Sequence, residues 1–313
     1  MAELSVGYLL PTRDWTLDDG DHRSLVEQAR LAEVLGFDSV WAGDSPVTRP
    51  RADPLLVLAA ASAITERVTL GTAVLLPALR HPVLLAHQLA SLDRIADGRL
   101  VVGVGAGFPN PNTQAQFEAV GIDFKRRVSR MEESIDAMRR LWTEDSVTHE
   151  GRHFTFHDVA LAPKPVQPQG PPIWLAAGGE QALRRVARLA DGWLPYPPSA
   201  QTYADEWELI QKEARRPITP ALYATVCLDD DPERARHRLR TSIERYYNAP
   251  LEFIGSIQAM CAGSAGDVAA WLGRYTAAGV RHVVIRLAVD DHRAALQEFA
   301  DQVLPLLHEK GRS

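Results

Sequence analysis

Short apolar runs alternate with amphipathic patterns along almost the whole chain. Eight of the runs predict strands, at about residues 4–10, 38–42, 68–76, 100–105, 172–177, 192–196, 221–228 and 282–288. Apolar residues spaced near 3.6 positions predict helices over about residues 22–35, 54–64, 82–96, 126–142, 181–190, 203–215, 232–246, 267–278 and 293–307. Many of the strand-like runs are continuously apolar, as in parallel strands buried on both faces. Eight β/α units in 313 residues favour an α/β fold of the closed (β/α)8 type, the TIM barrel, over an open doubly wound sheet.

Two segments interrupt this alternation. Residues 147–169 are rich in proline and aromatic residues and fit no β/α unit, so we expect an insertion after strand four. Residues 248–266 form a second irregular stretch before the last β/α unit. Neither segment has the Gly/Ser composition of a linker, and we therefore expect one domain over residues 1–313.

Composition and charge narrow the choice of partner. The net charge is −6 and basic residues form no long run, which argues against nucleic acid as the main partner. No stretch of about 18 uncharged apolar residues could cross a membrane, and no basic segment at the N-terminus leads into an apolar one. The two cysteines, Cys227 and Cys261, form no CxxC motif. We therefore expect a reduced, cytoplasmic protein that binds a small molecule, with a homodimer left open.

In a barrel of this type the active site lies at the C-terminal ends of the strands. Gly178 and Gly179 follow the fifth predicted strand and precede a helix. Glycines let the backbone approach a ligand, and a helix start offers free N–H groups that suit a phosphate. A tight turn without a ligand explains the same two residues equally well.

The glycines of residues 103–107 (GVGAG) resemble a dinucleotide-binding fingerprint. The pattern fails at its sixth position, which is Phe108, and Asn110 and Pro111 follow where a helix should begin. We therefore expect no Rossmann site. Close approach of a flat ring to the backbone at Gly105 and Gly107 remains open.

Residues 149–153 (HEGRH) match the HExxH pattern of zinc enzymes. Zinc binding requires both histidines on one face of a helix, but Gly151 interrupts this segment and the residues after it alternate as in a strand. Histidines four residues apart on a strand are about 13 Å apart, which is too far to share one ion. We expect no metal site.

Two further polar residues stand at predicted strand ends. Asp44 follows strand two, where it could cap a helix, anchor a loop or act in the site. His81 lies between Arg80 and Pro82 at a helix start, where a capping or buried structural role is as consistent as a ligand contact.

An ordered set of motifs resembles that of the bacterial luciferase-like family of flavin and deazaflavin oxidoreductases. The motifs are residues 36–44 (GFDSVWAGD), 70–74 (LGTAV), 80–86 (RHPVLLA), 92–93 (LD), 98–100 (GRL), 103–107 (GVGAG), 163–167 (PKPVQ), 171–174 (PPIW) and 191–193 (DGW). The match is dense over about residues 4–200, and the last third of the chain matches only by topology. Each motif alone is weak, but their order is specific.

This resemblance implies a barrel that binds reduced FMN or the deazaflavin coenzyme F420 at its C-terminal mouth. It implies that the phosphate lies near Gly178 and Gly179, and Gly105 and Gly107 are further cofactor-binding candidates. It further implies a cis peptide between Ala73 and Val74 that supports the ring. Asp44 and His81 are the catalytic candidates at this mouth.

The chain also departs from the family pattern. Ser45 stands where relatives often carry histidine, and Phe108 stands where the sugar-phosphate dehydrogenases of the family carry an acid. The acid–base pair of those dehydrogenases is therefore missing. Ser45, Phe108, Trp193 and Tyr196 are the predicted pocket residues. Their largely apolar and aromatic character predicts a hydrophobic organic substrate.

The resulting functional prediction is an oxidoreductase whose cofactor does the chemistry. With reduced FMN and oxygen it would be a monooxygenase, and with F420 it would transfer a hydride without oxygen. Arginine greatly outnumbers lysine, which is weak evidence of a GC-rich source and favours F420 only slightly. The alternative from another class is a non-catalytic flavin-binding barrel.

Overall fold

The computed structural model describes residues 4–17, 22–47 and 51–311, and its central element is a closed barrel of eight parallel strands. Neighbouring strands around the barrel run in the order β1, β2, β3, β4, β7, β8, β9 and β11, and β11 pairs with β1 to close the ring. Their bounds are β1 Ser5–Leu9, β2 Ser39–Ala42, β3 Thr69–Thr72, β4 Leu100–Val104, β7 Ile173–Leu175, β8 Gly192–Trp193, β9 Thr219–Leu228 and β11 His282–Leu287. The predicted (β/α)8 barrel is confirmed.

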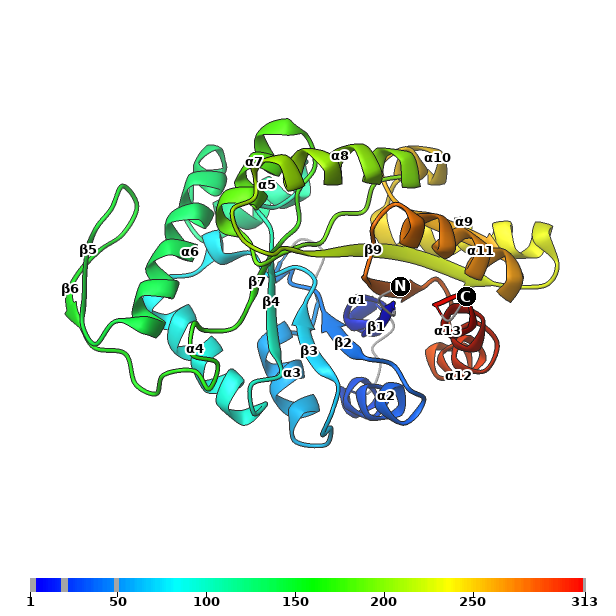
Figure 1. Ribbon diagram of the computed structural model, residues 1–313, viewed down its shortest axis with the longest axis horizontal. Helices are drawn as coiled ribbons and strands as arrows, with labels where there is room; N and C mark the ends of the chain where they lie inside the picture. The colour runs from blue at the N-terminus through cyan, green and yellow to red at the C-terminus, as the bar shows by residue number, and fades with distance from the viewer. Residues whose placement is uncertain (1–3, 18–21, 48–50, 312–313) are drawn as a thin grey trace.

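Helices surround the barrel on the outside (Figure 1). They are α1 Thr12–Leu17, α2 His22–Val34, α3 Pro54–Ser62, α4 Pro82–Ile95, α5 Pro111–Ala119, α6 Arg127–Thr143, α7 Glu180–Leu189, α8 Ala200–Glu213, α9 Pro232–Tyr247, α10 Leu251–Gly255, α11 Ala265–Ala277, α12 His292–Gln302 and α13 Leu304–Gly311. Short 3₁₀ turns, Pro77–Leu79 and Phe124–Arg126, precede α4 and α6. None of the helices in the described residues is long and apolar enough to cross a membrane.

Several helices begin where a polar residue is followed by proline. The side chain of Asp53 accepts hydrogen bonds from two backbone amides of α3, and Pro54 occupies the first helical position. Asn110 and Pro111 start α5 in the same way, with the Asn110 side chain accepting from the amide of Thr113 at 2.8 Å. The prediction that no helix begins at Asn110 is therefore wrong. The polar side chain and the fixed φ of proline together start the helix.

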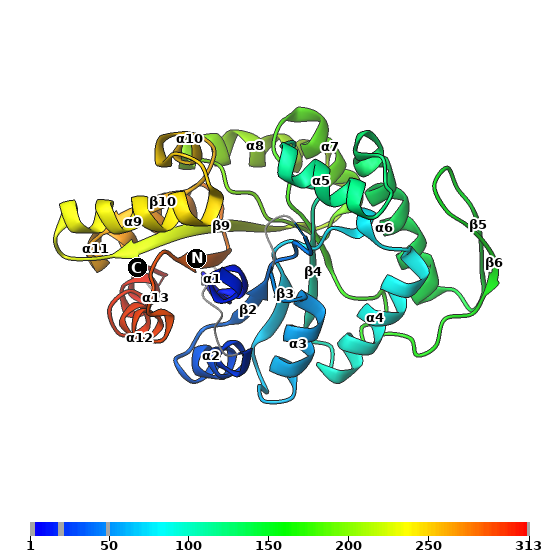
Figure 2. The ribbon, with the colours of Figure 1, turned by 180° about the vertical axis from the view of Figure 1, so that it is seen from behind.

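The two irregular segments adopt regular structure. Within residues 147–169, β5 (Val147–Glu150) and β6 (Thr155–Val159) form an antiparallel hairpin that stands beyond α6 in both views (Figure 1 and Figure 2). Within residues 248–266, α10 precedes a further strand, β10 (Met260–Gly263), which pairs in parallel with the outer half of β9. The long β9 makes this possible because it continues beyond its pairing with β8.

Two tryptophans fill the interior of the barrel. Trp41 and Trp174 have ring centroids 5.2 Å apart, and glycines on neighbouring strands make room for them. A Cβ at Gly71 would lie 2.1 Å from the Trp41 ring, and one at Gly192 would lie 2.4 Å from Trp174. His282 packs against both rings, and burial lowers its pKa to about 4. With the interior filled, a ligand has room at the mouth, where the strands end.

Candidate active site at the barrel mouth

The ends of β3 and β4 form one wall of the mouth. The Ala73–Val74 peptide is cis, which confirms the prediction, and both residues are half-buried. The next residue, Leu75, lies beside β4, and its amide donates to the Gly103 carbonyl at 2.8 Å. The Val74 side chain packs against Gly105, where a Cβ would lie 2.8 Å from Val74 Cγ2. Gly105 therefore makes room for Val74.

Gly107 has a different place in the structure. Its φ is +85°, and a Cβ there would lie 2.7 Å from Thr113 Cγ2 and 3.6 Å from the Phe117 ring. The residue turns the chain toward α5, whose packing leaves no space for a side chain. The structure thus gives Gly107 a role in the turn, and its predicted contact with a cofactor stays a prediction.

Gly178 and Gly179 lie exposed at the start of α7. Gly179 has a φ of +81° and precedes the first residue of the helix, and nothing lies within 4 Å of the position that its Cβ would take. Its amide donates to Glu206 Oε1 of α8 at 3.0 Å. Burial raises the pKa of the Glu206 carboxyl, and the Gly179 amide opposes this rise. A carboxylate thus already binds where a phosphate was expected, which shows that this helix start accepts an anionic oxygen.

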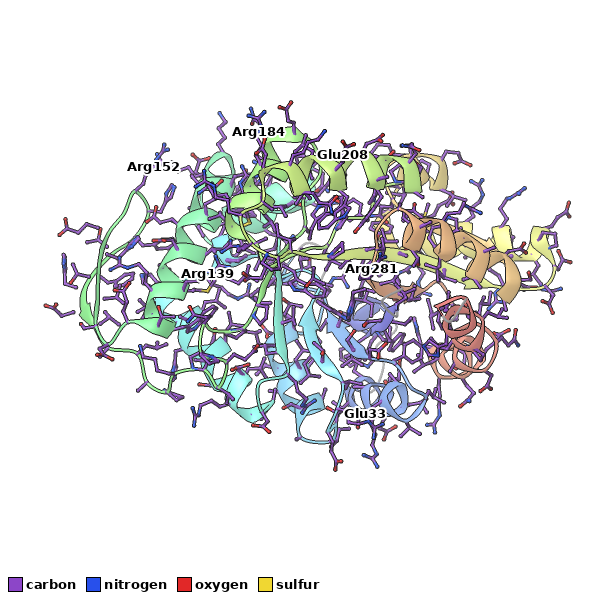
Figure 3. All side chains as sticks on the ribbon, in the orientation of Figure 1. Glu33, Arg139, Arg152, Arg184, Glu208 and Arg281 are labelled. Carbon is purple, nitrogen blue, oxygen red and sulfur yellow. The ribbon has the colours of Figure 1, made fainter. Side chains whose placement is uncertain are left out.

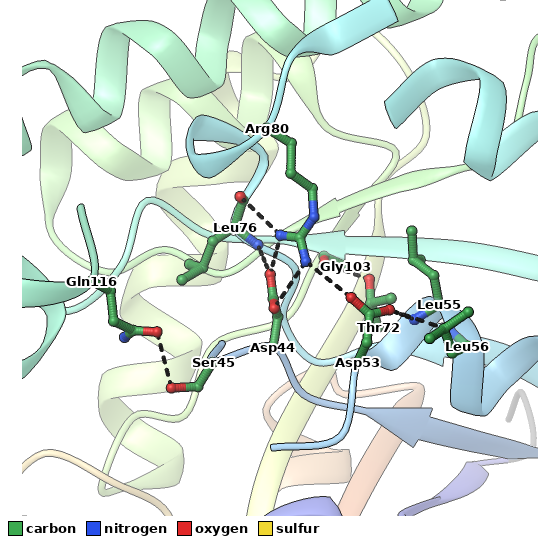
Figure 4. Close-up of polar contacts among 10 residues, drawn as sticks. All are labelled: Asp44, Ser45, Asp53, Leu55, Leu56, Thr72, Leu76, Arg80, Gly103 and Gln116. Atoms are coloured by element: carbon green, nitrogen blue, oxygen red, sulfur yellow. Dashed lines mark hydrogen bonds and ion pairs between the residues drawn. The ribbon is translucent and has the colours of Figure 1, made fainter. Parts of the chain in front are cut away.

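Asp44 is committed to an ion pair with Arg80 (Figure 4). Arg80 donates from Nη1 and Nη2 to the two carboxylate oxygens at 2.5 and 3.1 Å, and the amide of Leu76 donates to Oδ2 at 3.0 Å. The Asp44 side chain is only 2% exposed. Of the roles considered for it, the structure shows loop anchoring, and Asp44 fixes the segment between β3 and α4.

Ser45 and His81 are also engaged by neighbouring residues. The hydroxyl of Ser45 donates to Gln116 Oε1 of α5 at 3.1 Å. His81 caps α4, where its Nδ1 accepts from the Val83 amide at 3.3 Å, and its ring packs edge-on against Phe154 of the hairpin segment. Burial and the nearby charge of Arg130 lower the pKa of His81. The structure therefore shows the capping role for this histidine.

The three predicted aromatic pocket residues lie in different places. Phe108 is 42% exposed beyond the end of β4, and Tyr196 follows β8 with its ring edge-on to Tyr223. Trp193 is fully buried, stacked with Trp207 of α8. Its pocket role is wrong, because adjacent strand residues face opposite sides: Gly192 faces the interior and Trp193 faces the helices.

The HEGRH segment lies away from the mouth on the hairpin, with Arg152 at the projecting tip (Figure 3). His149 is on β5, and His153 is in the turn that follows. The prediction of a strand is therefore correct for His149 and wrong for His153. Glu133 of α6 joins them, accepting from the His153 amide at 3.0 Å and lying 3.2 Å from His149 Nε2. The segment is not helical, and among the described residues no His, Cys, Asp and Glu side chains group as a metal site.

Sequence reasoning missed a polar cluster at this mouth. Arg13 of α1, Arg51 before α3 and Arg286 of β11 converge on the ring of Tyr246 near the end of α9. Arg13 and Arg51 follow the first two strands, so charge after a strand end was a signal available in the sequence. The aromatic member comes from the last third of the chain, where no motif pointed to it.

A cavity of about 810 Å3 lies elsewhere on the surface, between α6, α7 and α8. Its lining includes Arg185, Arg188, Arg215 and Arg216, and the last two precede β9 at the opposite end of the barrel. Arg185 and Arg188 bind Glu132. This arrangement is a surface ion-pair network remote from the C-terminal ends of the strands.

Comparison with known proteins identifies the family. The model of the luciferase-like monooxygenase family matches residues 4–282. The chain belongs to this family. The luciferase-like chain is therefore an oxidoreductase, as its motifs predicted, and members of the family use F420 or FMN.

Individual relatives agree with this assignment. The luciferase-like chain is 30% identical to an F420-dependent glucose-6-phosphate dehydrogenase of Intrasporangium calvum over 90% of this chain and 94% of the relative. A crystal structure of a monooxygenase from Streptomyces bottropensis matches with a TM-score of 0.82 and 26% identity, over 96% and 99% of the two chains. An F420-dependent secondary alcohol dehydrogenase in complex with an F420–acetone adduct shares the fold, with a TM-score of 0.80 and 21% identity over 97% and 99%.

Proposed function

We propose that this luciferase-like protein is a cytoplasmic, F420-dependent oxidoreductase that transfers a hydride to or from a hydrophobic organic substrate. The observation that carries the proposal is the barrel mouth, where the half-buried Val74 side chain and the exposed residues Gly178 and Gly179 lie at strand ends of one barrel. They offer an apolar support for a flat ring and an anion-binding helix start. The free cysteines Cys227 and Cys261 fit a reducing compartment.

The residues of the mouth fit a cofactor of this kind. Ala73 and Val74 would support the ring, and the amides of Gly178 and Gly179 would bind its phosphate in place of the Glu206 carboxylate. When bound, F420 supplies the hydride chemistry. The protein holds the ring, orients the substrate and excludes water from the reacting atoms.

F420 is favoured over FMN by relatedness and by composition. The Intrasporangium relative, similar over 90% of this chain, is named as F420-dependent. The excess of arginine over lysine agrees with a source that makes this cofactor. We do not propose glucose-6-phosphate, the substrate in that relative's name, as the substrate of this protein. Phe108 stands in place of an acid here, and Ser45 stands in place of a histidine.

The substrate class follows from the side chains at the rim. The ring of Phe108 is exposed at the end of β4, and Tyr196 is half-buried after β8, two strands further around the barrel. These residues provide apolar contact area with a single polar tip. A hydrophobic molecule that carries one oxidisable or reducible oxygen function fits this lining.

The test is titration of purified, cofactor-free protein with F420 and with FMN, followed by fluorescence. We expect F420 to bind at least tenfold more tightly than FMN. Reduced F420 should then be reoxidised by organic carbonyl compounds in the absence of oxygen. Tighter binding of FMN with oxygen-dependent turnover would replace hydride transfer by monooxygenation, and tight F420 binding without turnover of any substrate would favour a non-catalytic flavin-binding barrel.

A further inference from the structure

Tyr246 is enclosed by three guanidinium groups from three parts of the chain. The Cζ atoms of Arg286, Arg13 and Arg51 lie 3.8, 4.6 and 5.2 Å from the centroid of its ring. Tyr246 itself is 3% exposed. Each such cation–π contact contributes about 0.5–2 kcal/mol.

Arg51 connects this cluster to the proposed ring site. Its Nη2 donates to Tyr246 Oη at 2.5 Å. A Cβ at Gly43 would lie 3.0 Å from Arg51 Cζ and 3.1 Å from the carbonyl oxygen of Ala73. The guanidinium group and the ring-supporting strand end therefore flank the same glycine, and Arg51 links this strand end to the phenol hydroxyl.

Arg286 is the most deeply buried cation of the cluster, and two of its nitrogen atoms are unsatisfied within the described part of the chain. Arg286 is 2% exposed, and its Nη2 donates to Ser242 Oγ at 3.0 Å and lies 3.7 Å from Asp14 Oδ1. Its Nε and Nη1 atoms have no hydrogen-bond partner among the described residues. A buried guanidinium group whose donors are not all hydrogen-bonded is costly. An ionised phenol at Tyr246 would supply negative charge at the centre of the cluster.

The three polar residues that the sequence predicted at the mouth are bound to structural partners. Asp44 is paired with Arg80, and the hydroxyl of Ser45 donates to Gln116. His81 caps α4 and packs against the hairpin. The acid–base pair that the family's sugar-phosphate dehydrogenases use is missing from the sequence, so another residue must handle the proton.

We propose that Tyr246 exchanges this proton with the substrate and that Arg51 positions its hydroxyl, an inference that rests on the proposed function. In oxidation of an alcohol, the C–H bond breaks and its hydride leaves to the cofactor. The O–H bond breaks, its proton goes to the phenolate oxygen of Tyr246, and a C=O bond forms. In reduction each of these changes is reversed, and the phenol gives its proton to the carbonyl oxygen.

The surroundings of Tyr246 make its hydroxyl unusually acidic. Burial raises the pKa of Tyr246, but the charges of Arg51, Arg13 and Arg286 outweigh burial and lower it, with Asp14 opposing them. Burial raises the pKa values of the neighbouring hydroxyls of Tyr223 on β9 and Tyr247 on α9, and it lowers that of His292 at the start of α12, so these groups stay neutral. Among these groups, Tyr246 is therefore the one whose ionisation its surroundings favour.

The first test is an ultraviolet titration of tyrosine ionisation in the cofactor-free protein. In the wild type, one tyrosine should ionise below pH 10, and this step should disappear in Tyr246→Phe. Tyr247→Phe is the matched control, because it removes the adjacent hydroxyl and should keep the early step. Arg51→Met should weaken the acidity of Tyr246 by at least about tenfold. Identical titrations of the wild type and Tyr246→Phe would overturn the proposal.

The second test separates proton exchange from cofactor binding. Tyr246→Phe should lower kcat by about 100-fold or more and should abolish the corresponding limb of the pH profile. F420 should bind within twofold of wild type, because the ring and its support are retained. A kcat within threefold of wild type, with normal cofactor binding, would overturn the role of Tyr246 alone. Failure of the wild type to bind either cofactor would instead overturn the proposed function.

Discussion

Glu206 occupies the expected phosphate site, and this makes cofactor affinity depend on its charge. Its carboxylate accepts from the Gly179 amide at 3.0 Å, so an incoming phosphate must displace it or bind beside it. Glu206→Gln keeps the size and the acceptor oxygen but removes the negative charge. We expect this substitution to strengthen binding of F420.

The magnitude follows from the distance and the exposure. A phosphate bound to the same helix start would lie about 5 Å from the carboxylate. At an effective dielectric constant of about 40–80, suited to a half-exposed pair, the repulsion is about 1–2 kcal/mol. Removing it should tighten binding by about 5- to 30-fold.

The pH dependence has a definite sign. Because burial raises the pKa of Glu206, its carboxyl is more readily neutralised on mild acidification than an ordinary glutamate. Protonation removes the repulsion, so wild-type affinity for F420 should increase as the pH falls from about 8 to 5. Glu206→Gln should lack this component, since its amide does not titrate in that range.

Fluorescence titrations at pH 5, 6.5 and 8 measure this effect. The control is Glu208→Gln, which removes the same charge from the same helix at an exposed position paired with Lys212 (Figure 3). This variant should follow the wild type at each pH. If Glu206→Gln binds F420 no more tightly than Glu208→Gln, the phosphate does not bind at Gly179 and the reasoning fails.

Four further predictions concern the glycine turn, the ring support, the barrel interior and the hairpin. Gly179 and Gly36 both have φ above +80° and free space where a Cβ would lie. Gly179→Ala and Gly36→Ala should therefore each lower the free energy of unfolding by about 1 kcal/mol. Only Gly179→Ala should also weaken F420 binding, by about tenfold. Val74→Gly should weaken binding by about 1–2 kcal/mol and slow turnover, because apolar contact with the ring is lost, and unchanged affinity would refute the contact. Burial lowers the pKa of His282 to about 4, so this histidine is protonated more readily in the unfolded chain than in the folded protein. Between pH 7 and pH 5 the wild type should therefore lose about 2 kcal/mol of unfolding free energy relative to His282→Asn, as measured by urea unfolding. His149→Ala should leave activity unchanged, and metal analysis should find no stoichiometric zinc; one tightly bound zinc per chain would contradict the hairpin geometry.

The barrel was predictable because its signals are local. Continuous apolar runs marked the eight strands, and Asp53 followed by Pro54 marked a helix start with a defined hydrogen bond. The same logic applied to Asn110 and Pro111 would have found α5. There the capping signal lies directly after the glycines that resemble a dinucleotide-binding pattern.

The site was less predictable because it depends on side-chain direction and on long-range contacts. Trp193 stands at a strand end, yet its direction is fixed by the alternation with Gly192, and it faces α8. Glu206 reaches Gly179 from 27 residues away, and nothing local marks it. Tyr246 meets Arg51 across 195 residues, so the chemistry of that cluster exists only after the barrel closes.

A crystal structure of the protein with F420 bound would show where the cofactor lies. The ring should be in van der Waals contact with Val74, and a phosphate oxygen should lie within hydrogen-bond distance of the Gly178 or Gly179 amide. Tyr246 should lie within reach of a substrate atom at the mouth. A cofactor bound away from the strand ends, for example among Arg188 and Arg216 between the outer helices, would contradict the proposed site.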